Sequence, residues 1–407
     1  MTAPKLRFKE FTDIWKEYKL MDFAESIIGL TYSPDDIVSE DEGTLILRSS
    51  NIKDSNLVFT DNVYVKTKIP EKLMVQPYDI LLCSRNGSRA LIGKSAFIDK
   101  HYHNTSFGAF MTIIRSKQNS KFSYQLLKTN NFKKQMHINL GATINQITTK
   151  DLNNFKFYMP SSNVERKKIA IFLEIFDKKI QLQQEKIDLL KEQKKGYMQK
   201  IFSRELRFKD KDGQEYPKWS QQKLGDFTER VTRKNSDLVT TRPLTISAQH
   251  GLIDQIEFFN KTVASENLTG YYLLNKGEFA YNKSYSNGYP LGAIKRLDDY
   301  QNGALSTLYI CFTPKDNVIS DFLVHYFDSA QWYKEVSLIC VEGARNHGLL
   351  NVSVSEFFDT LHYLPCTEEQ IKIAKFFDCI NQKIKLQEQT LKNIQAKKQA
   401  LMQQMFI

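Results

Sequence analysis

The sequence has little of several features that mark particular classes of protein. It contains 5 cysteines among 407 residues, and no two of them are separated by only two residues. An odd number at such spacings argues against a disulfide framework or a zinc site and fits a reducing cytoplasm. No run of about 18 apolar residues occurs, and the charged stretch from Met1 to Glu10 lacks the apolar core of a signal sequence. We therefore expect a cytoplasmic protein without membrane segments.

Motifs for catalysis are incomplete. Gly87–Ser95 ends in Gly-Lys-Ser, but five residues separate its glycines, whereas a phosphate-binding loop needs four. His101 and His103 have no cysteine or acidic residue at metal-binding spacing. Pro34-Asp35 resembles the start of a nuclease motif, but the required lysine does not follow Glu40–Glu42. The sequence also lacks Asn-Pro-Pro-Tyr, Asp-Pro-Pro-Tyr and a glycine-rich cofactor loop. We expect no catalysis, metal or cofactor in this chain.

The composition that is present indicates folded domains with a basic surface. Hydrophobic residues make up 41% and aromatic residues 12% of the chain, which is ample for packed cores. A length of 407 residues favours two or more domains. The net charge is +11, from 57 Lys and Arg against 46 Asp and Glu. Such an excess suits a surface that binds phosphates, although a soluble basic protein would show it too.

The chain is a tandem repeat of one long unit. Leu6-Arg7-Phe8 recurs as Leu206-Arg207-Phe208, Trp15 corresponds to Trp219, and Lys19–Glu25 corresponds to Lys223–Glu229. The ends of the units match at an offset of 204 residues: Ile169-Ala170 with Ile373-Ala374, Lys179-Ile180 with Lys383-Ile384, Met198 with Met402, and Phe202 with Phe406. Residues 26–145 and 230–350 share little. Two units of this length indicate duplicated domains and exclude a solenoid of short repeats.

Each unit ends in a stretch that predicts a long helix. Gly and Pro almost vanish after Pro160 and Pro365, and apolar residues recur at alternating steps of three and four for about 33 residues, on the order of 50 Å of helix. This spacing is typical of a coiled coil; two helices packed separately on their own domains are the alternative. The predicted seam includes Ile180, Gln183, Ile187, Leu190, Lys194, Ile384, Gln387, Leu391, Ile394 and Lys398.

The polar positions of the seam predict its direction. Each helix has one Gln and one Lys on the seam, at matching places. In an antiparallel pair, one register puts Gln183 opposite Lys398 and Gln387 opposite Lys194. Polar seam residues can fix register at a cost in stability. We therefore predict an antiparallel coiled coil with pseudo-two-fold symmetry, which would hold two globular parts apart over two separate DNA segments.

The globular parts predict an α+β fold, because short apolar runs alternate with turn residues. The expected strands are Thr44–Arg48, Asp79–Cys83, Phe110–Ile114 and Ser306–Phe312, and the expected helices are Phe122–Met136 and Ser320–Val336. The predicted organisation is a first globular domain at 1–160, a central spacer helix at 161–204, a second globular domain at 205–365 and a C-terminal spacer helix at 366–407.

Three loops in each globular part are candidates for DNA contact. Arg and Lys suit guanine, Asn and Gln suit adenine, and Ser suits phosphate. Each loop alone is more simply a solvated turn, but three corresponding pairs favour DNA binding for the set. The candidate residues are Arg48, Ser50, Asn51, Arg85, Asn86, Ser88, Arg89, Asn145 and Gln146 in the first part, and Gln249, His250, Lys283, Ser284, Tyr285, Asn287, Arg345, Asn346 and His347 in the second.

The order of these features resembles the specificity subunits of Type I restriction-modification systems. The likeness rests on the two Leu-Arg-Phe…Trp…Lys-Leu…Asp-Phe starts and on the Pro-x-x-x-Glu-Gln-x-x-Ile-Ala sequence at Pro365–Ala374. The first copy, Pro160–Ala170, is one residue longer and has Arg for Gln. The resemblance covers essentially the whole chain.

The resemblance implies a non-catalytic subunit with two target recognition domains that read a bipartite, asymmetric site in double-stranded DNA. It implies two methyltransferase subunits that use S-adenosylmethionine, and restriction subunits that use ATP and Mg, as partners. A specificity protein of a related methyltransferase without restriction is the nearest alternative. A coiled-coil scaffold that does not bind DNA, and an enzyme acting alone, are the others.

Overall fold

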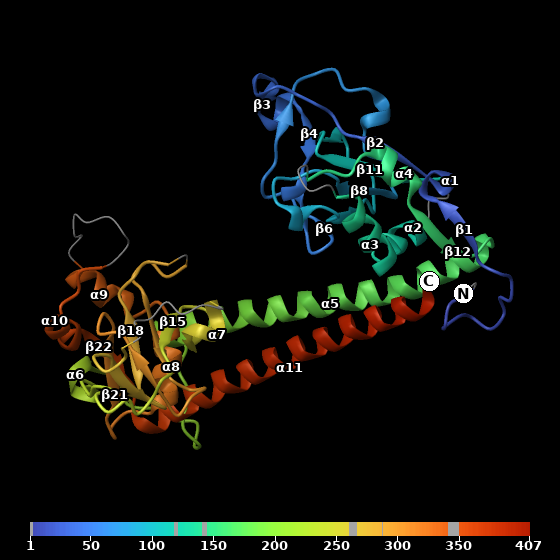
Figure 1. Cartoon of the computed structure of the whole chain (residues 1–407). Coiled ribbons are helices and arrows are strands. Elements are labelled where there is room, and N and C mark those ends of the chain that lie inside the picture. The colour runs from blue at the N-terminus through green and yellow to red at the C-terminus, as the bar shows by residue number, and fades with distance from the viewer. Residues whose placement is uncertain (1–2, 118–120, 141–144, 260–266, 287, 341–349) are drawn as a thin grey trace. The chain divides into compact units, whose positions relative to one another are not determined.

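The computed structural model describes residues 3–117, 121–140, 145–259, 267–286, 288–340 and 350–407. The chain divides into two compact units: unit 1 comprises residues 1–184 and 389–407, and unit 2 comprises residues 185–388. Each of the two long helices, α5 (Asn163–Phe202) and α11 (Thr367–Met405), therefore contributes to both units (Figure 1). Within the described residues, no helix is both long and apolar enough to span a bilayer.

Unit 1 is built on two four-stranded sheets and two two-stranded ribbons. The first sheet has the order β2-β11-β8-β9 and the second the order β10-β4-β7-β3, while β1 pairs with β12 and β5 with β6. The strands are β1 (Lys16–Lys19), β2 (Ala24–Ile28), β3 (Ile37–Val38), β4 (Thr44–Leu47), β5 (Ile52–Lys53), β6 (Asn56–Leu57), β7 (Tyr64–Val65), β8 (Asp79–Cys83), β9 (Ser95–Phe97), β10 (Thr105–Phe107), β11 (Met111–Ser116) and β12 (Lys156–Met159).

The short helices of unit 1 are α1 (Leu20–Phe23), α2 (Phe122–Leu126), α3 (Asn130–Asn139) and α4 (Thr149–Asn154). Their apolar faces share one core with β8, β11, β12 and the start of α5. Met402, Met405 and Phe406, at the other end of the sequence, belong to this same core. A second core fills the space between the two sheets and includes Leu47, Phe107 and Ile113. The first unit therefore needs the last residues of the chain to complete its packing.

Unit 2 repeats the frame of unit 1. A four-stranded sheet has the order β14-β21-β18-β19, and the pairs β13-β22, β15-β16 and β17-β20 surround it. The strands are β13 (Ser220–Lys223), β14 (Thr228–Arg230), β15 (Leu244–Ser247), β16 (Gly251–Asp254), β17 (Tyr272–Asn275), β18 (Phe279–Asn282), β19 (Ala293–Arg296), β20 (Asn302–Leu305), β21 (Ile310–Pro314) and β22 (Leu361–Leu364). The short helices are α6 (Leu224–Phe227), α7 (Gln255–Phe259), α8 (Ser320–Asp328), α9 (Tyr333–Ile339) and α10 (Val354–Asp359).

The predicted α+β class and the antiparallel course of the long helices are confirmed in each unit. In unit 2, the ring centroids of Phe202, at the end of α5, and Phe377, near the start of α11, lie 5.9 Å apart. In unit 1, the α11 residue Lys398 donates to Asp177 of α5 at 2.5 Å. All ten predicted seam residues named above are buried or half-buried.

Lys398 contacts a residue of α5 other than the predicted one, and its pairing with Gln183 stays a prediction. Its partner Asp177 lies six residues before the expected partner, Gln183, which is about 9 Å along the helix. The carboxylate attracts the ammonium group more strongly than an amide would, so the lysine side chain extends toward it. The pairing of Lys194 with Gln387 stays a prediction.

Two long helices predicted in the globular parts are each broken in two. The range Phe122–Met136 covers α2 and most of α3, and Thr129 caps the second of them by accepting a hydrogen bond from the backbone of Phe132. The range Ser320–Val336 covers α8 and the first part of α9, separated after Asp328. The apolar periodicity continues across each break because both short helices pack on the same core. The pattern therefore predicted one helix where the structure has two.

Candidate nucleic-acid interface

A buried glutamate fastens the start of the long helix to the start of unit 1. The guanidinium of Arg7 donates two hydrogen bonds, of 2.7 and 2.8 Å, to the carboxylate of Glu165, and the indole N–H of Trp15 donates a third at 3.3 Å. Glu165 is fully buried. The hydrogen bond to Glu165 raises the pKa of Arg7. A buried carboxylate needs such a set of donors to offset its lost hydration.

The same arrangement occurs in unit 2. Arg207 donates to both oxygens of Glu369 at 3.2 and 2.6 Å, and Trp219 donates at 3.1 Å. We call each of these three-residue sets a clamp. The clamps join the Leu-Arg-Phe and Trp motifs of each unit to the glutamate of its helix start. Sequence reasoning identified all these residues as matching but did not identify their contact.

The repeats differ at the residue after each clamp glutamate, which is Arg166 in unit 1 and Gln370 in unit 2. The side-chain amide of Gln370 donates to the carbonyl of Pro365 at 2.9 Å. In unit 1 the corresponding residue is Arg166, whose Nε donates to the carbonyl of Pro160 at 2.6 Å. Arginine therefore makes the bond that glutamine makes in the other unit. Burial lowers the pKa of Arg166.

Three predicted loops of unit 1 come together at the carboxyl end of β8. The amide of Asn86 donates to the hydroxyl of Ser49 at 3.1 Å, and its backbone N–H donates to the carbonyl of Asn145 at 3.2 Å. The side chain of Asn145 donates to the carbonyl of Gly87 at 3.1 Å. Arg85 and Gln146 form an antiparallel bridge. The three loops thus form one surface, which we call the loop cluster: residues 48–50, 85–89, 145 and 146.

The side chains of the loop cluster are accessible to different degrees. Arg85, Ser88, Arg89 and Ser50 are exposed. The half-buried Arg48 forms an ion pair with the exposed Asp61 at 2.9 Å. The half-buried residues Asn86, Asn145 and Gln146 hold the backbone of the cluster through the contacts above. The exposed cations and hydroxyl groups have the chemistry for guanine and phosphate contact.

Asn51 was predicted wrongly as a DNA contact. It is fully buried. Its Oδ1 accepts from the backbone of Arg48 at 2.9 Å, and its amide donates to the carbonyl of Val58 at 3.1 Å. An asparagine with both ends of its amide committed inside the fold cannot reach a base edge. Its role is to close the turn that presents Arg48 and Ser50.

The corresponding loops of unit 2 are only partly described. Gln249 and His250 are exposed on the turn between β15 and β16. The ammonium group of Lys283 donates to the carbonyl of Val352 at 3.4 Å, and Tyr285 is 61% exposed. Ser284 is half-buried. Four further candidates lie outside the described residues: Asn287, Arg345, Asn346 and His347.

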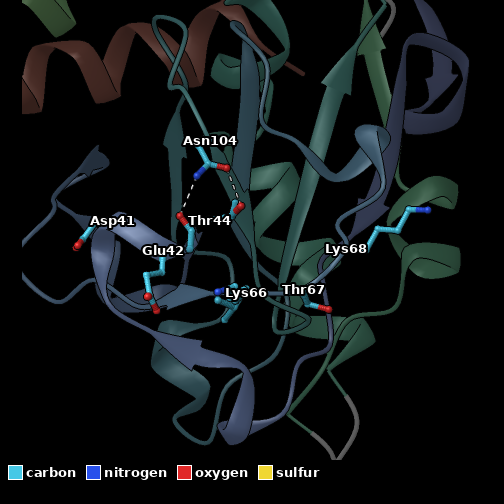
Figure 2. Close-up of a pocket in the computed structure, with 9 residues that line it drawn as sticks. Asp41, Glu42, Thr44, Lys66, Thr67, Lys68 and Asn104 are labelled. Atoms are coloured by element: carbon cyan, nitrogen blue, oxygen red, sulfur yellow. Dashed lines mark hydrogen bonds between the residues drawn. The ribbon is translucent and has the colours of Figure 1, made fainter.

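A separate pocket of about 410 Å³ lies beside β4 and β7 of unit 1 (Figure 2). Asp41 and Glu42 line it together with Lys66 and Lys68, so its lining includes residues of both charges. Asn104 forms part of its wall: it accepts from the hydroxyl of Thr44 at 2.7 Å and donates to the carbonyl of Gly43 at 2.8 Å. Within the described residues, no group of three or more His, Cys, Asp or Glu is arranged to hold a metal ion.

A charged network joins α2 and the long helices within unit 1. Asp177 accepts from Lys398 at 2.5 Å and from the amide of Gln125 at 2.8 Å, and the ammonium group of Lys128 lies 3.7 Å away. Burial would raise the pKa of Asp177, but the two lysines outweigh it and lower that pKa. Burial lowers the pKa of both lysines. The network joins α2 and the residue Lys128 to the two long helices within unit 1.

Comparison with protein families gives one match. Residues 13–192 match the family described as the Type I restriction modification DNA specificity domain. The chain is also 30% identical over 130 residues to the specificity subunit of the Type I restriction enzyme EcoKI of Escherichia coli (strain K12), covering 30% of this chain and 27% of that one. It is 29% identical over 150 residues to the StySPI specificity subunit of Salmonella potsdam, covering 35% and 32%. The matches thus span less than a third of each relative.

Two solved structures share the fold over nearly the whole chain. The S subunit of a Type I restriction-modification system from M. genitalium has a TM-score of 0.56 at 17% identity, with 100% of this chain and 99% of that chain covered. A second structure, from work on assembly and conformational transition of the type I R-M system, has a TM-score of 0.53 at 13% identity, with coverage of 95% and 96%. At such identities the likeness concerns the fold.

Proposed function

We propose that the chain is a specificity subunit of a Type I restriction-modification system, which the match at residues 13–192 supports, and that it reads a bipartite, asymmetric site in double-stranded DNA. Each unit reads one half of the site. The long helices set the distance between the halves. The chain itself performs no chemistry; partner subunits bind S-adenosylmethionine, ATP and Mg, and the assembly acts in the cytoplasm.

The observation that carries this proposal is the loop cluster of unit 1. Segments separated by up to about a hundred residues are joined by side-chain and backbone hydrogen bonds into one surface. That surface offers two exposed arginines, Arg85 and Arg89, and two exposed serines. Loops held on a rigid sheet are suited to specific recognition. The loops at matching places in unit 2 have different side chains, so the two half-sites differ in sequence.

Lengthening both helices tests the spacer role. A seven-residue insertion after Gln184, with a matching one after Glu388, would add about 10 Å to each helix, equal to at most about three base pairs. Sequencing of methylated DNA from cells with the complete system should show the same half-site bases and a longer gap. The control places seven residues in the exposed turn at Asp212 and Gly213. A changed base or an unchanged gap would contradict the spacer role.

A stripe on the outer face of α5 supports the recruitment of a methyltransferase subunit. Five large apolar residues on this stripe are 49% to 67% exposed: Val164, Ile171, Ile175, Leu182 and Leu189. Their spacing of 7, 4, 7 and 7 residues keeps them within about 40° around the helix. At the matching positions α11 has Glu368, Lys375, Cys379, Leu386 and Asn393. An exposed apolar stripe of this kind marks a partner surface.

We propose that helices of the methyltransferase subunit cover this stripe, and that restriction subunits join the resulting assembly. The variant Ile171→Glu with Ile175→Glu should reduce the methyltransferase subunit that co-purifies with the chain. Lys375→Glu, at the position of α11 that matches Ile171, is the control and should retain it. Equal recovery with both variants would place the docking surface elsewhere.

A further inference from the structure

An exposed aromatic ring supports one arginine of the loop cluster. Phe110 directly precedes β11 and is 52% exposed. The guanidinium carbon of Arg85 lies 4.9 Å from the centroid of its ring. Such a cation–π contact contributes about 0.5–1 kcal/mol at an exposed site. It also restricts the guanidinium to positions over the ring.

The backbone on both sides of this contact is fixed. The carbonyl of Phe110 accepts from the backbone N–H groups of Ser84 and Arg85, at 3.1 and 3.0 Å, and from the hydroxyl of Ser84 at 3.3 Å. Ser84 in turn accepts from the hydroxyl of Thr112 on β11 at 2.8 Å. The bridge between Arg85 and Gln146 holds the other edge. The arginine therefore starts from a rigid position, and its side chain rests on a rigid support.

The donors of Arg85 are left available by this arrangement. Among the described residues, no carboxylate lies within ion-pair distance of its guanidinium. Contact with a ring face uses the plane of the guanidinium and leaves the N–H groups at its edge for a ligand. A planar fork held in one orientation matches the two acceptors of guanine in the major groove, N7 and O6.

We propose that Arg85 reads a guanine in the half-site of unit 1, and that Phe110 is the positioning residue that orients it. This rests on the proposed function, since it requires unit 1 to read DNA. Holding the fork in place before binding reduces the conformational entropy lost on binding. Arg89 and Ser88, on the same loop but without such a support, are left to contact the backbone of the DNA.

Unit 2 lacks this pair, and the strand register shows what replaces it. Asp79, the first residue of β8, and Glu278, directly before β18, occupy matching places, since each accepts from the backbone N–H three residues before it, at 2.8 and 2.7 Å. Arg85 lies six residues after Asp79, and Ser284 lies six residues after Glu278. Ser284 therefore takes the place of Arg85. The arginine contact is therefore a property of unit 1, and the guanine requirement belongs to one half-site.

The support is replaced as well. Thr112 pairs with Leu82, and Ile310 pairs with Tyr281 at the matching position of unit 2. Two residues earlier, Leu308 therefore takes the place of Phe110, and it is 66% exposed. Because unit 2 has a leucine at this place, leucine is a suitable replacement for Phe110. Phe110→Leu keeps an exposed apolar side chain and removes only the ring.

The test uses the complete complex and a library of DNA sites that vary at every position of the methylated sequence. Arg85→Ala should lower the preference for guanine at one position of one half-site by about ten-fold or more, as expected for loss of a bidentate contact. Arg85→Lys should lose most of the same preference, because an ammonium group lacks the planar fork. Phe110→Leu should reduce the preference at that same position, and Phe110→Trp should retain it. Leu308→Ala is the control and should leave this position unchanged.

The outcomes separate this inference from the proposed function. If the wild-type complex shows no sequence preference, the proposed function fails. If the wild type is selective and Arg85→Ala alters no guanine position, only the inference fails. If Arg85→Ala acts and Phe110→Leu equals the wild type, Phe110 has no positioning role. Equal effects of Phe110→Leu and Phe110→Trp, or a change in the other half-site, would indicate a general disturbance of the fold and would also contradict the proposal.

Discussion

A buried histidine should make unit 2 sensitive to acid. His362 lies on β22 and is 2% exposed. The hydroxyl of Thr360 donates to the carbonyl of Phe357 at 2.7 Å, so its oxygen accepts the Nε2–H of His362 at 2.8 Å. Nδ1 then accepts from the hydroxyl of Tyr326 at 2.7 Å. The imidazole is therefore neutral, and burial lowers its pKa from 6.5 to about 4.

The size of the effect follows from this pKa. Because the pKa of His362 is lower in the folded state, protonation of this histidine favours the unfolded chain. The folded state therefore has its full stability above pH 6.5 and becomes less stable as the pH falls toward 4. Between pH 7.5 and pH 5 the unfolded chain binds the proton and the folded chain does not. The resulting loss in the free energy of unfolding is about 2 kcal/mol. Burial lowers the pKa of His325 as well, so His325 acts in the same direction.

The residues of unit 1 at the places of His362 and Tyr326 suggest a variant of unit 2 that lacks the buried histidine. Phe157, which pairs with Tyr18 on β1, occupies the place that His362 occupies opposite Gln222 on β13. Residue 126, a leucine, stands where unit 2 has Tyr326. The double variant Tyr326→Leu with His362→Phe should therefore remove about 2 kcal/mol of the acid sensitivity. Hydrogen exchange in peptides from α8 and β22, corrected for the intrinsic rate at each pH, measures the free energy of opening. An equal loss between pH 7.5 and pH 5 in the wild type and the variant would refute the reasoning.

Three further predictions concern the frame of the units, each measured by unit-specific hydrogen exchange. Glu369→Gln should destabilise unit 2 by about 3 kcal/mol, because it breaks a buried ion pair, and Glu165→Gln should do the same to unit 1; equal losses in both units from either variant would contradict independent clamps. Arg166→Gln should stay within about 1 kcal/mol of the wild type, because Gln370 makes the equivalent bond, and a larger loss would mean that the charge matters. Phe406→Ala should cost unit 1 about 3–5 kcal/mol and spare the recognition domain of unit 2, whereas a loss confined to the terminal helix would contradict a shared core.

The repeat, the helices and the fold class could be predicted because they rest on periodic or duplicated residues. A helix that buries one stripe must repeat apolar residues every three or four positions. The expected ranges 161–204 and 366–407 contain α5 and α11 with margins of a few residues. Two of the three candidate loops of unit 1 follow strands that the apolar pattern predicted, Thr44–Arg48 and Asp79–Cys83. The meeting of the three loops at one surface was not predicted.

Other features could not be read from the sequence, because they depend on contacts between distant residues. Glu165 could be matched to Glu369 from the sequence, but only the structure shows its contacts with Arg7 and Trp15. Asn51 has the side chain of a base-reading residue, and only its committed amide shows that it is structural. Phe110 was placed within a predicted strand, and its exposed position was not predicted. Its exposure depends on β11 beginning one residue later.

The division between matching and divergent residues has a physical basis in the kind of contact each residue makes. The clamps act through side chains: replacing the arginine, the tryptophan or the glutamate leaves a buried polar group without a partner, so both copies retain all three. In the loop cluster, the bonds from Arg85 to Phe110 and from Asn86 to Asn145 are backbone bonds, although the side chains of Asn86 and Asn145 also join the loops. A backbone bond permits any compatible side chain, so Arg85 can become Ser284, and Phe110 can become Leu308, at no cost to the frame. This arrangement lets one fold present two different recognition surfaces.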